Sequence, residues 1–420
     1  MKSILFPSGV VALLVFGGCS TAPGTQQSEG TGGQGGLASG TGGGSGVGGA
    51  TSSGGMIGAG GATAGTGGSA AGTGGATAGT GGTTAGTGGT TAGTGGKTGT
   101  GGVTAGTGGA TGTTQIQCGL PAVGTSGAAK PSGTAGNLKV INWAGFKGAV
   151  SYTFDDANQT QIDNYPALNA LGVHMTFYLI TGKNTMSNAV WPQAVKDGHE
   201  LGNHTQSHAQ TGTAADIDAA TAYIKQHFGV TPYTMAAPYG DASYEPLAKT
   251  RFFVNRGVAN NLVKPNDTTD PWNLPCYIPP TAALASAFNS QIDTAESGGG
   301  WRIVLVHGFG TSDGSYQPVD IAEFTASVTH AKSFGDMWID SVADVGAYWV
   351  GQKLLSSTTA SASASGSTWT WTLPSNFPPG KCLRVTVDGG TLKQGGNTLA
   401  WDSHGYYEIS LDAGSLTLSP

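Results

Sequence analysis

Charged side chains make up only 10% of this 420-residue chain, and its N-terminal part has almost none. Between Ser20 and Gln117 the only charged residues are Glu29 and Lys97, and no aromatic residue occurs. Such a segment cannot bury enough apolar surface to offset the conformational entropy that folding removes. We therefore predict that residues 20–137 form a disordered linker.

Glycine dominates this linker, in which Gly-Thr-Gly-Gly recurs every seven residues from Gly65 to Gly93. The repeat has no apolar a and d positions, which excludes a coiled coil. It also has no hydrophobic face, which excludes a solenoid. A Gly-rich chain of this length has an end-to-end distance of roughly 50–60 Å. We interpret the segment as a flexible tether.

Clusters of Lys and Arg are also missing, and the formal net charge is −6. Nucleic acids and anionic membrane surfaces attract proteins through basic patches. Neither is therefore expected as a partner of the folded part. No oligomerisation signal is visible, and a long tether suits a monomer.

The first nineteen residues differ from the linker: Lys2 precedes an apolar run, "VVALLVF", and small residues precede Cys19. The apolar run is too short for a permanent membrane span. The segment resembles a bacterial lipoprotein signal, which implies that Cys19 is lipidated and becomes the mature N-terminus. The alternative is an ordinary secretory signal with an incidental cysteine. Both predict export. A lipid anchor, with Ser20 after the cysteine, predicts a cell-envelope lipoprotein at the outer membrane or cell surface.

Cysteine is scarce, with four in the whole chain. If Cys19 is lipidated, Cys118, Cys276 and Cys382 remain. An exported protein permits one disulfide among these three, with one thiol left over. The sequence leaves all three pairings open.

Apolar content returns near Leu138, where strand-like and helix-like runs begin to alternate. The strand-like runs are residues 148–154, 173–180, 200–205, 233–239, 251–258, 301–307 and 337–340, and the helix-like runs are 163–171, 188–197, 214–228, 281–297 and 320–333. Alternation of this kind predicts a parallel sheet covered by helices. About seven strands favour a deformed β/α barrel over residues 138–355. An open doubly wound sheet is the alternative, weakened because no Gly-rich dinucleotide loop follows the first strand.

The C-terminal part of the chain has a different sequence pattern. Residues 356–367 form a low-complexity bridge rich in Ser and Ala, and residues 368–420 alternate as short strands with turns between them. This pattern predicts a small β-rich appendage. Its aromatic residues are either a carbohydrate-binding surface or, as we favour, part of its own core; they are Trp369, Trp371, Trp401 and Tyr406.

Two adjacent carboxylates, Asp155 and Asp156, end the first strand-like run, "SYTFDD". In a β/α barrel the C-terminal ends of strands carry the chemistry, and His204 and His307 also follow strands. His204 and His208 are four residues apart in "GNHTQSH". Two imidazoles at this spacing and one carboxylate make a zinc site with an open fourth position. We therefore predict a catalytic metal site.

The stretches "SYTFDD", "GNHTQSH", "APYG" and "IVLVH", in this order, resemble the motifs of the polysaccharide deacetylase (NodB-like) family, carbohydrate esterase family four, over about residues 149–349. The resemblance implies a deformed β/α barrel. It implies that Asp155 is the general base, that the Tyr239 N–H binds the oxyanion and that His307 is the general acid. It also implies a divalent metal, Zn²⁺ or a similar ion such as Co²⁺, whose ligands are Asp156, His204 and His208.

The chain departs from the family pattern at two motifs. Ala236 stands where the family has an Arg that contacts the catalytic Asp, and Arg256 is a candidate to replace it. An ordinary surface ion pair is the alternative for Arg256. The carboxylate motif that orients the family's acid is only approximated by "NDTTDPWN", in which we choose Asp270 first and Asp267 second.

Three further aromatic residues are candidates to line a sugar groove, although such residues are more often part of the core: Tyr178, Trp272 and Trp301.

The motifs predict a metal-dependent hydrolase that removes acetyl groups from an N-acetylated polysaccharide, such as chitin-like material or peptidoglycan. An O-acetyl esterase acting on xylan is the alternative, because an ester has a better leaving group and asks less of His307. A non-catalytic surface carbohydrate-binding protein is the third hypothesis, and Ala236 alone favours it.

Overall fold

The structure is a computed structural model that describes residues 113–116 and 118–420. The predicted signal, Cys19 and the linker up to residue 112 lie outside the described residues. Among the helices of the described part, none is long and apolar enough to cross a membrane.

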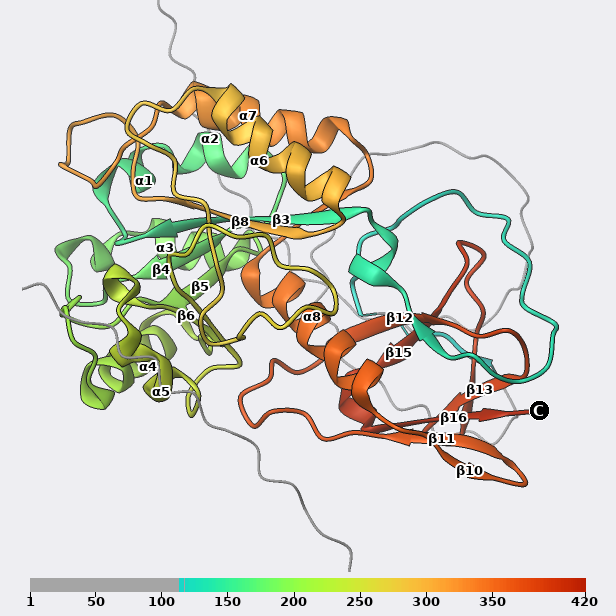
Figure 1. Ribbon diagram of the computed structural model, residues 1–420. Coiled ribbons are helices and arrows are strands. Elements are labelled where there is room, and N and C mark those ends of the chain that lie inside the picture. The colour runs from blue at the N-terminus through green and yellow to red at the C-terminus, as the bar shows by residue number, and fades with distance from the viewer. Residues whose placement is uncertain (1–112, 117) are drawn as a thin grey trace, which may run out of the picture. The chain divides into compact units, whose positions relative to one another are not determined.

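A curled, parallel sheet of seven strands forms the centre of the domain (Figure 1). Its strands are β3 (Gly148–Asp155), β4 (Thr176–Leu179), β5 (Glu200–Asn203), β6 (Thr234–Ala236), β7 (Val254–Arg256), β8 (Trp301–Val306) and β9 (Met337–Ile339). The order is β7-β6-β5-β4-β3-β8, and β9 pairs with the start of β3. Every residue of β3 is buried, as expected for a parallel strand covered on both faces.

An irregular segment, rather than a strand, connects the two edge strands of this sheet. Leu274 forms an isolated bridge with Arg256 of β7, and Tyr277 forms one with Val304 of β8. The sheet therefore closes only partly into a barrel. This confirms the predicted deformed β/α barrel, and each of the seven predicted strands is present within a few residues.

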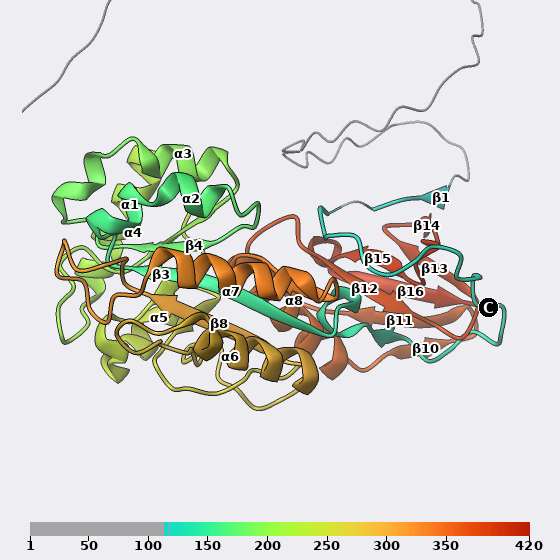
Figure 2. The same ribbon diagram turned by 90° about the horizontal axis from the view of Figure 1, so that it is seen from above.

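Helices cover the sheet on both faces. They are α1 (Gln159–Asp163), α2 (Tyr165–Asn169), α3 (Val190–Lys196), α4 (Ala214–Phe228), α5 (Glu245–Ala248), α6 (Ala285–Gly298), α7 (Ile321–Ser333) and α8 (Val342–Ser357). α6 and α7 lie side by side over β3 and β8 (Figures 1 and 2). α4 starts where the Thr213 side chain accepts from the Asp216 N–H, and it ends at Gly229 with φ 72°, which are common N-cap and C-cap arrangements.

The C-terminal part forms two small sheets, which we call the β module (Figure 2). One sheet has the order β1-β14-β13-β16-β11-β10 and the other β15-β12-β2. The strands are β1 (Thr113–Thr114), β2 (Lys139–Val140), β10 (Ser361–Ser363), β11 (Gly366–Thr370), β12 (Cys382–Thr386), β13 (Thr391–Gln394), β14 (Asn397–Leu399), β15 (Tyr407–Ser410) and β16 (Ser415–Ser419). α8 contacts β3 on the barrel side and β12 of the module.

The domain boundaries differ from those expected. α8 runs to Ser357, and β10 and β11 pair as a hairpin, so the expected bridge at 356–367 is regular structure. The end of the expected linker also belongs to the module, because β1 pairs with β14 and Gly136 forms a bridge with Gly389. Backbone pairing to a distant strand orders these Gly-rich and Ser-rich segments, which carry no apolar pattern of their own.

The aromatic residues of the module contribute to its core, as we favoured. Trp371 and Tyr406 are 6% and 5% exposed. Trp369 and Trp401 are partly buried against the hydrophobic cluster that contains Trp371, and this cluster also includes residues of α8 and of the parallel sheet. The module and the barrel therefore share one continuous core.

The disulfide joins Cys118 to Cys382, whereas Cys276 is a buried free thiol. The crosslink ties the chain before β2 to β12. We expect Cys118→Ser with Cys382→Ser to lower the free energy of unfolding by about 2–5 kcal/mol, because the bridge closes a long loop and restricts the unfolded chain. Denaturant titration checks this. Cys276→Ala is the control, and an unchanged midpoint in the double variant would contradict the prediction.

Buried His199 makes stability depend on pH. Its Nδ1 accepts from the Met175 N–H and its Nε2 lies 3.3 Å from Asn169 Oδ1, so the ring is neutral. Burial lowers the pKa of His199 to about 4, below the ordinary value of about 6.5. The unfolded chain therefore takes up this proton first, and the contribution present above pH 6.5 is lost as the pH falls towards 4. We expect a loss of about 3 kcal/mol.

Unfolding titrations at pH 7 and pH 4 on the native protein and His199→Asn measure this contribution. The variant should be less stable at pH 7 but should lack most of this pH dependence. Equal slopes in the two proteins would show that other groups cause it.

Candidate active site

The C-terminal ends of the parallel strands bring the predicted site residues to one edge of the sheet. Asp155 ends β3 and Asp156 directly follows it, and His204 directly follows β5. Arg256 ends β7, and His307 directly follows β8. Strand register thus gathers residues that are up to about 150 positions apart in the sequence.

The backbone around these residues is unusual. Asp156, Ala157, Thr205, His208 and Tyr239 have positive φ values between 54° and 76°. Non-glycine residues rarely adopt this region, and a β-branched residue such as Thr205 does so at particular cost. Conformations of this kind persist where the surrounding structure imposes them, and they gather at functional sites.

Asp156, His204 and His208 form a cluster with the geometry of a metal site. One ligand atom from each lies within 4.8 Å of the others. The Asp156 Oδ1 atom is 3.4 Å from His204 Nε2 and 3.5 Å from His208 Nε2. Two imidazole nitrogens and one carboxylate oxygen are donors that zinc and similar divalent ions accept.

Hydrogen bonding shows that this cluster fits a cation. His204 Nδ1 is 2.8 Å from the Ala236 carbonyl oxygen, so it carries the proton and Nε2 presents a lone pair. Asp156 Oδ1 is buried and has no hydrogen-bond partner among the described residues. Acceptors therefore face one another without a donor between them, which is unfavourable unless a cation is bound. The residues present fit a divalent metal.

Asp155 forms a buried ion pair with Arg256. The Arg256 Nη2 donates to Asp155 Oδ2, and both side chains are almost fully buried. Ala236 and Arg256 are direct register partners on β6 and β7. The guanidinium therefore approaches Asp155 from the strand next to the one that carries the family's Arg. Asp155 Oδ1 has no hydrogen-bond partner among the described residues, which leaves it able to accept a proton.

The structure does not support the prediction that Asp270 or Asp267 orients His307. Asp270 accepts from the Trp272 N–H, and Asp267 accepts from the N–H groups of Lys264 and Thr269. Each carboxylate caps its own loop, as Asp does in Asx turns. Neither is hydrogen-bonded to His307.

No carboxylate of the described residues is thus hydrogen-bonded to the His307 ring. Its Nδ1 is buried and unpaired among the described residues. Burial lowers the pKa of His307. Its carbonyl oxygen accepts from the side chains of Asn158 and Gln161, two polar residues that the motif comparison did not single out. The two residues lie within "DDANQTQ", about 150 positions before His307, and this stretch gives no sequence signal of the contact.

The aromatic candidates do not line the site. Tyr178 and Trp301 are fully buried, and the Trp272 indole donates to the Phe252 carbonyl. Two other tyrosines are exposed beside the site. Tyr239 is 58% exposed with its ring 4.6 Å from His208, and Tyr316 is 60% exposed with its ring 5.2 Å from His307. We had assigned a role only to the backbone of Tyr239, and Tyr316 was missed.

A cavity of about 610 Å³ opens onto the metal cluster. Its walls include Asp156 and His208 together with Ile180, Lys183 and Gln206. It is therefore the part of the site to which a substrate has access.

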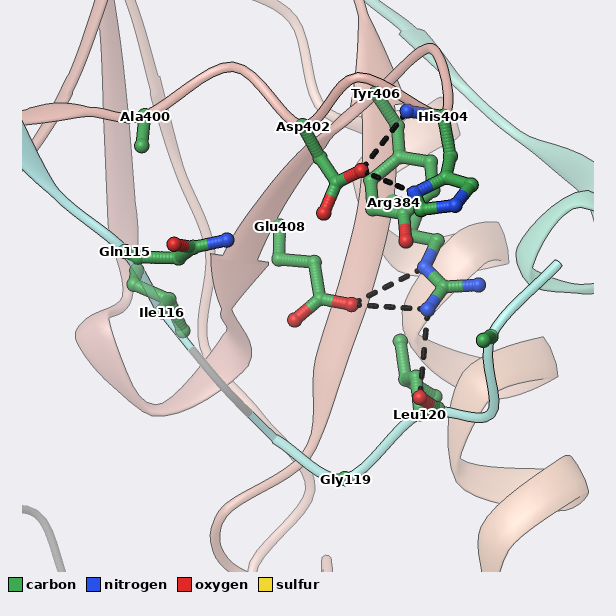
Figure 3. Close-up of a pocket in the computed structure, with 11 residues that line it drawn as sticks. Gln115, Ile116, Gly119, Leu120, Arg384, Ala400, Asp402, His404, Tyr406 and Glu408 are labelled. Atoms are coloured by element: carbon green, nitrogen blue, oxygen red, sulfur yellow. Dashed lines mark hydrogen bonds and ion pairs between the residues drawn. The ribbon is translucent and has the colours of Figure 1, made fainter. Parts of the chain in front are cut away.

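A second cavity, of about 290 Å³, lies in the β module and contains none of the predicted site residues (Figure 3). The Arg384 Nε donates to Glu408, and the His404 ring nitrogen Nδ1 lies 2.6 Å from Asp402. The Arg384 guanidinium also covers the Tyr406 ring. These groups thus pair with one another, and the Arg384 Nη2 also donates to the Leu120 carbonyl oxygen, which holds the chain before β2 against the module.

Residues 145–253 match the family model described as polysaccharide deacetylase. This part of the chain is therefore similar to that family. The match includes Asp155, Asp156, His204, His208 and Tyr239.

Comparison with individual proteins gives distant similarities. A gellan lyase from a Bacillus species is 29% identical over 147 residues, which cover 33% of this chain and 6% of that protein. The chain thus spans a small fraction of this curated relative. Peptidoglycan deacetylase PdaC from Bacillus subtilis is 18% identical, with 47% of this chain and 90% of that chain covered and a TM-score of 0.34. A family 4 acetyl xylan esterase from Clostridium thermocellum, in complex with cobalt, is 20% identical, with 47% and 89% covered and a TM-score of 0.33.

Proposed function

We propose that this protein is a metal-dependent hydrolase that removes acetyl groups from a polysaccharide, with an N-acetylated polymer as the first candidate. One observation carries the proposal: the lone pairs of Asp156 and His204 face each other without a donor, beside a buried carboxylate that Arg256 holds in place. The match of residues 145–253 to the deacetylase family supports it.

Each site residue has a distinct role in the proposed reaction. Asp156, His204 and His208 would hold a divalent ion, which would supply Lewis-acid polarisation of the acetyl carbonyl. Asp155 accepts a proton through Oδ1 from the water that attacks the carbonyl carbon, while Arg256 fixes its other oxygen. The Tyr239 N–H donates to the oxyanion, as the family resemblance implies. His307 donates a proton to the leaving group.

The second candidate substrate is an ester, and the environment of His307 is the observation that supports it. An amine leaving group must be protonated before it departs, whereas an alkoxide leaves more readily. No carboxylate of the described residues is hydrogen-bonded to the His307 ring, and burial lowers its pKa. A weaker acid suffices for an O-acetyl group, as on xylan.

Ala236 was the only residue that favoured a non-catalytic carbohydrate-binding protein. Because Arg256 contacts Asp155 from the neighbouring strand, the base keeps its charged partner despite Ala236. This contact removes the reason to expect loss of catalysis.

The test follows acetate release by the purified protein, stripped of metal and then given Zn²⁺, Co²⁺ or no ion. N-Acetylglucosamine oligomers and acetylated xylan serve as parallel substrates. Metal-dependent release from the first supports the amide deacetylase, and release from xylan alone supports the esterase. Metal binding without release from any acetylated polymer would contradict the proposal.

We also propose that Cys19 is lipidated and anchors the protein in the cell envelope, with the Gly-rich linker as a tether. The motif around Cys19 supports this. Labelling of the expressed protein with a radioactive fatty acid, and its recovery from the membrane fraction, should both be lost in Cys19→Ala. Unchanged labelling in the variant would contradict the proposal.

A further inference from the structure

Lys183 lies in the wall of the catalytic cavity, next to the metal cluster. It follows β4, and it lines the same cavity as Asp156 and His208. Its side chain is half-buried. The inference drawn from it rests on the proposed function of this site.

The side chain of Lys183 is held in a fixed position. Its Nζ donates to Asn158 Oδ1 at 2.5 Å. Asn158 is buried, and its Nδ2 donates to the His307 carbonyl oxygen at 2.8 Å and lies 3.4 Å from Asp156 Oδ2. The side-chain amide of Asn158 thus contacts the Lys183 ammonium group, the metal ligand Asp156 and the backbone of the proposed acid, His307.

Hydrogen bonds to a neighbouring loop also fix the backbone next to Lys183. The Thr181 N–H donates to the Thr205 carbonyl, and the Gly182 N–H donates to the Gln206 carbonyl. A Cβ on Gly182 would lie 2.5 Å from that Gln206 oxygen, so only glycine allows this approach. The loop after β4 is therefore joined to the loop that carries His204 and His208. Contacts thus fix both the side chain and the backbone of Lys183, so its ammonium group is preorganised for binding.

The charge of Lys183 is not matched by an ion pair in the part of the chain that the structure describes. Its Nζ forms no salt bridge within 4.0 Å to a carboxylate of the described residues. The two aspartates of the site have other roles, because Asp155 pairs with Arg256 and Asp156 belongs to the metal cluster with His204 and His208. With a divalent ion bound, the cavity has an excess of positive charge. Three N–H donors on an ammonium, of which Asn158 takes one, leave two for a ligand.

We propose that Lys183 is a specificity-determining residue that binds a carboxylate of the substrate. The substrate class would then be an acidic acetylated polysaccharide, in which the acetylated sugar or its neighbour bears a carboxylate. Neutral polymers would still react, but without this contact.

The test compares two acetylated polymers, polygalacturonate as the acidic one and xylan as the neutral one. The native protein is compared with Lys183→Gln and with Lys183→Arg, which keeps the charge. Lys225→Gln, on the exposed surface of α4, is the matched control for loss of one positive charge. We expect Lys183→Gln to lower kcat/KM on the acidic polymer by about 10- to 100-fold, as for loss of a charge-assisted hydrogen bond, and on xylan by less than about threefold. Lys183→Arg should retain most of the preference.

Equal losses on both polymers in Lys183→Gln would overturn the inference, because Lys183 would then act only by positioning Asn158. So would a native protein without preference for the acidic polymer. A binding measurement separates this inference from the proposed reaction. Calorimetric titration of oligogalacturonate into the metal-free protein should show binding that Lys183→Gln and 0.5 M salt both weaken. If acetate is never released but this binding is present, the proposed reaction fails and the carboxylate site stands. If the binding is absent, the inference fails.

Discussion

Asp155→Asn is expected to lower acetate release by about 10²- to 10⁴-fold, the range typical for loss of a general base. Asparagine has the size of aspartate, and its carbonyl oxygen can still accept from Arg256. It cannot take a proton from water. The fold and the metal cluster of Asp156, His204 and His208 should therefore persist while the proton acceptor is lost. Initial rates with Zn²⁺ at saturating substrate measure the effect on kcat.

Metal affinity, measured by competition with a chromophoric chelator, is the control for Asp155→Asn. It should change little, because Asp156 rather than Asp155 belongs to the metal cluster. His204→Ala is the contrasting variant and should lose both the metal and the activity. An Asp155→Asn protein with more than a tenth of native activity would exclude Asp155 as the base.

Arg256→Met is expected to lower both stability and activity. Removing one partner of a buried ion pair leaves the other charge unpaired, which typically costs about 3–5 kcal/mol. The Asp155 carboxylate would lose the contact that fixes Oδ2. We expect a melting temperature several degrees lower and a decrease in kcat of about 100-fold or more. Calorimetry and initial rates on the same preparation measure the two effects.

The register of β6 and β7 offers a sharper form of this experiment. Ala236 and Arg256 are paired directly, so Ala236→Arg with Arg256→Ala moves the guanidinium to the neighbouring strand. This exchange should recover part of the stability and activity that Arg256→Ala loses alone. Ala236→Arg in the native background should be destabilising, because two buried cations would compete for Asp155. If the exchange is no better than Arg256→Ala, a guanidinium near Asp155 is not sufficient and its approach from β7 is required.

Asp155 and Arg256 should also be coupled. If Arg256 acts on the reaction through Asp155, the rate losses of Asp155→Asn and Arg256→Met cannot add, because the second change removes a contact that no longer matters for proton transfer. The double variant should therefore be about as slow as Asp155→Asn alone.

The sequence by itself determined the fold class and the residues of the candidate site. Apolar runs alternating with amphipathic helices predict a parallel sheet, and a parallel sheet brings the ends of its strands to one edge. Asp155, Asp156, His204 and His307 all lie at strand ends, so the topology alone places them near one another. Local spacing predicted the pair of His204 and His208.

Only the tertiary structure decided which residues support the site. Arg256 can replace the family's Arg, which is Ala236 here, because these two residues are paired in the register of β6 and β7. The hydrophobic pattern of short, fully buried strands does not determine their register. Asp270 was misassigned because its loop satisfies the carboxylate locally. The contact between Lys183 and Asn158, like the pairing of Cys118 with Cys382, joins segments that loop conformations bring together. Such contacts between distant segments have no periodic signature, because they are fixed by the three-dimensional packing of the whole chain.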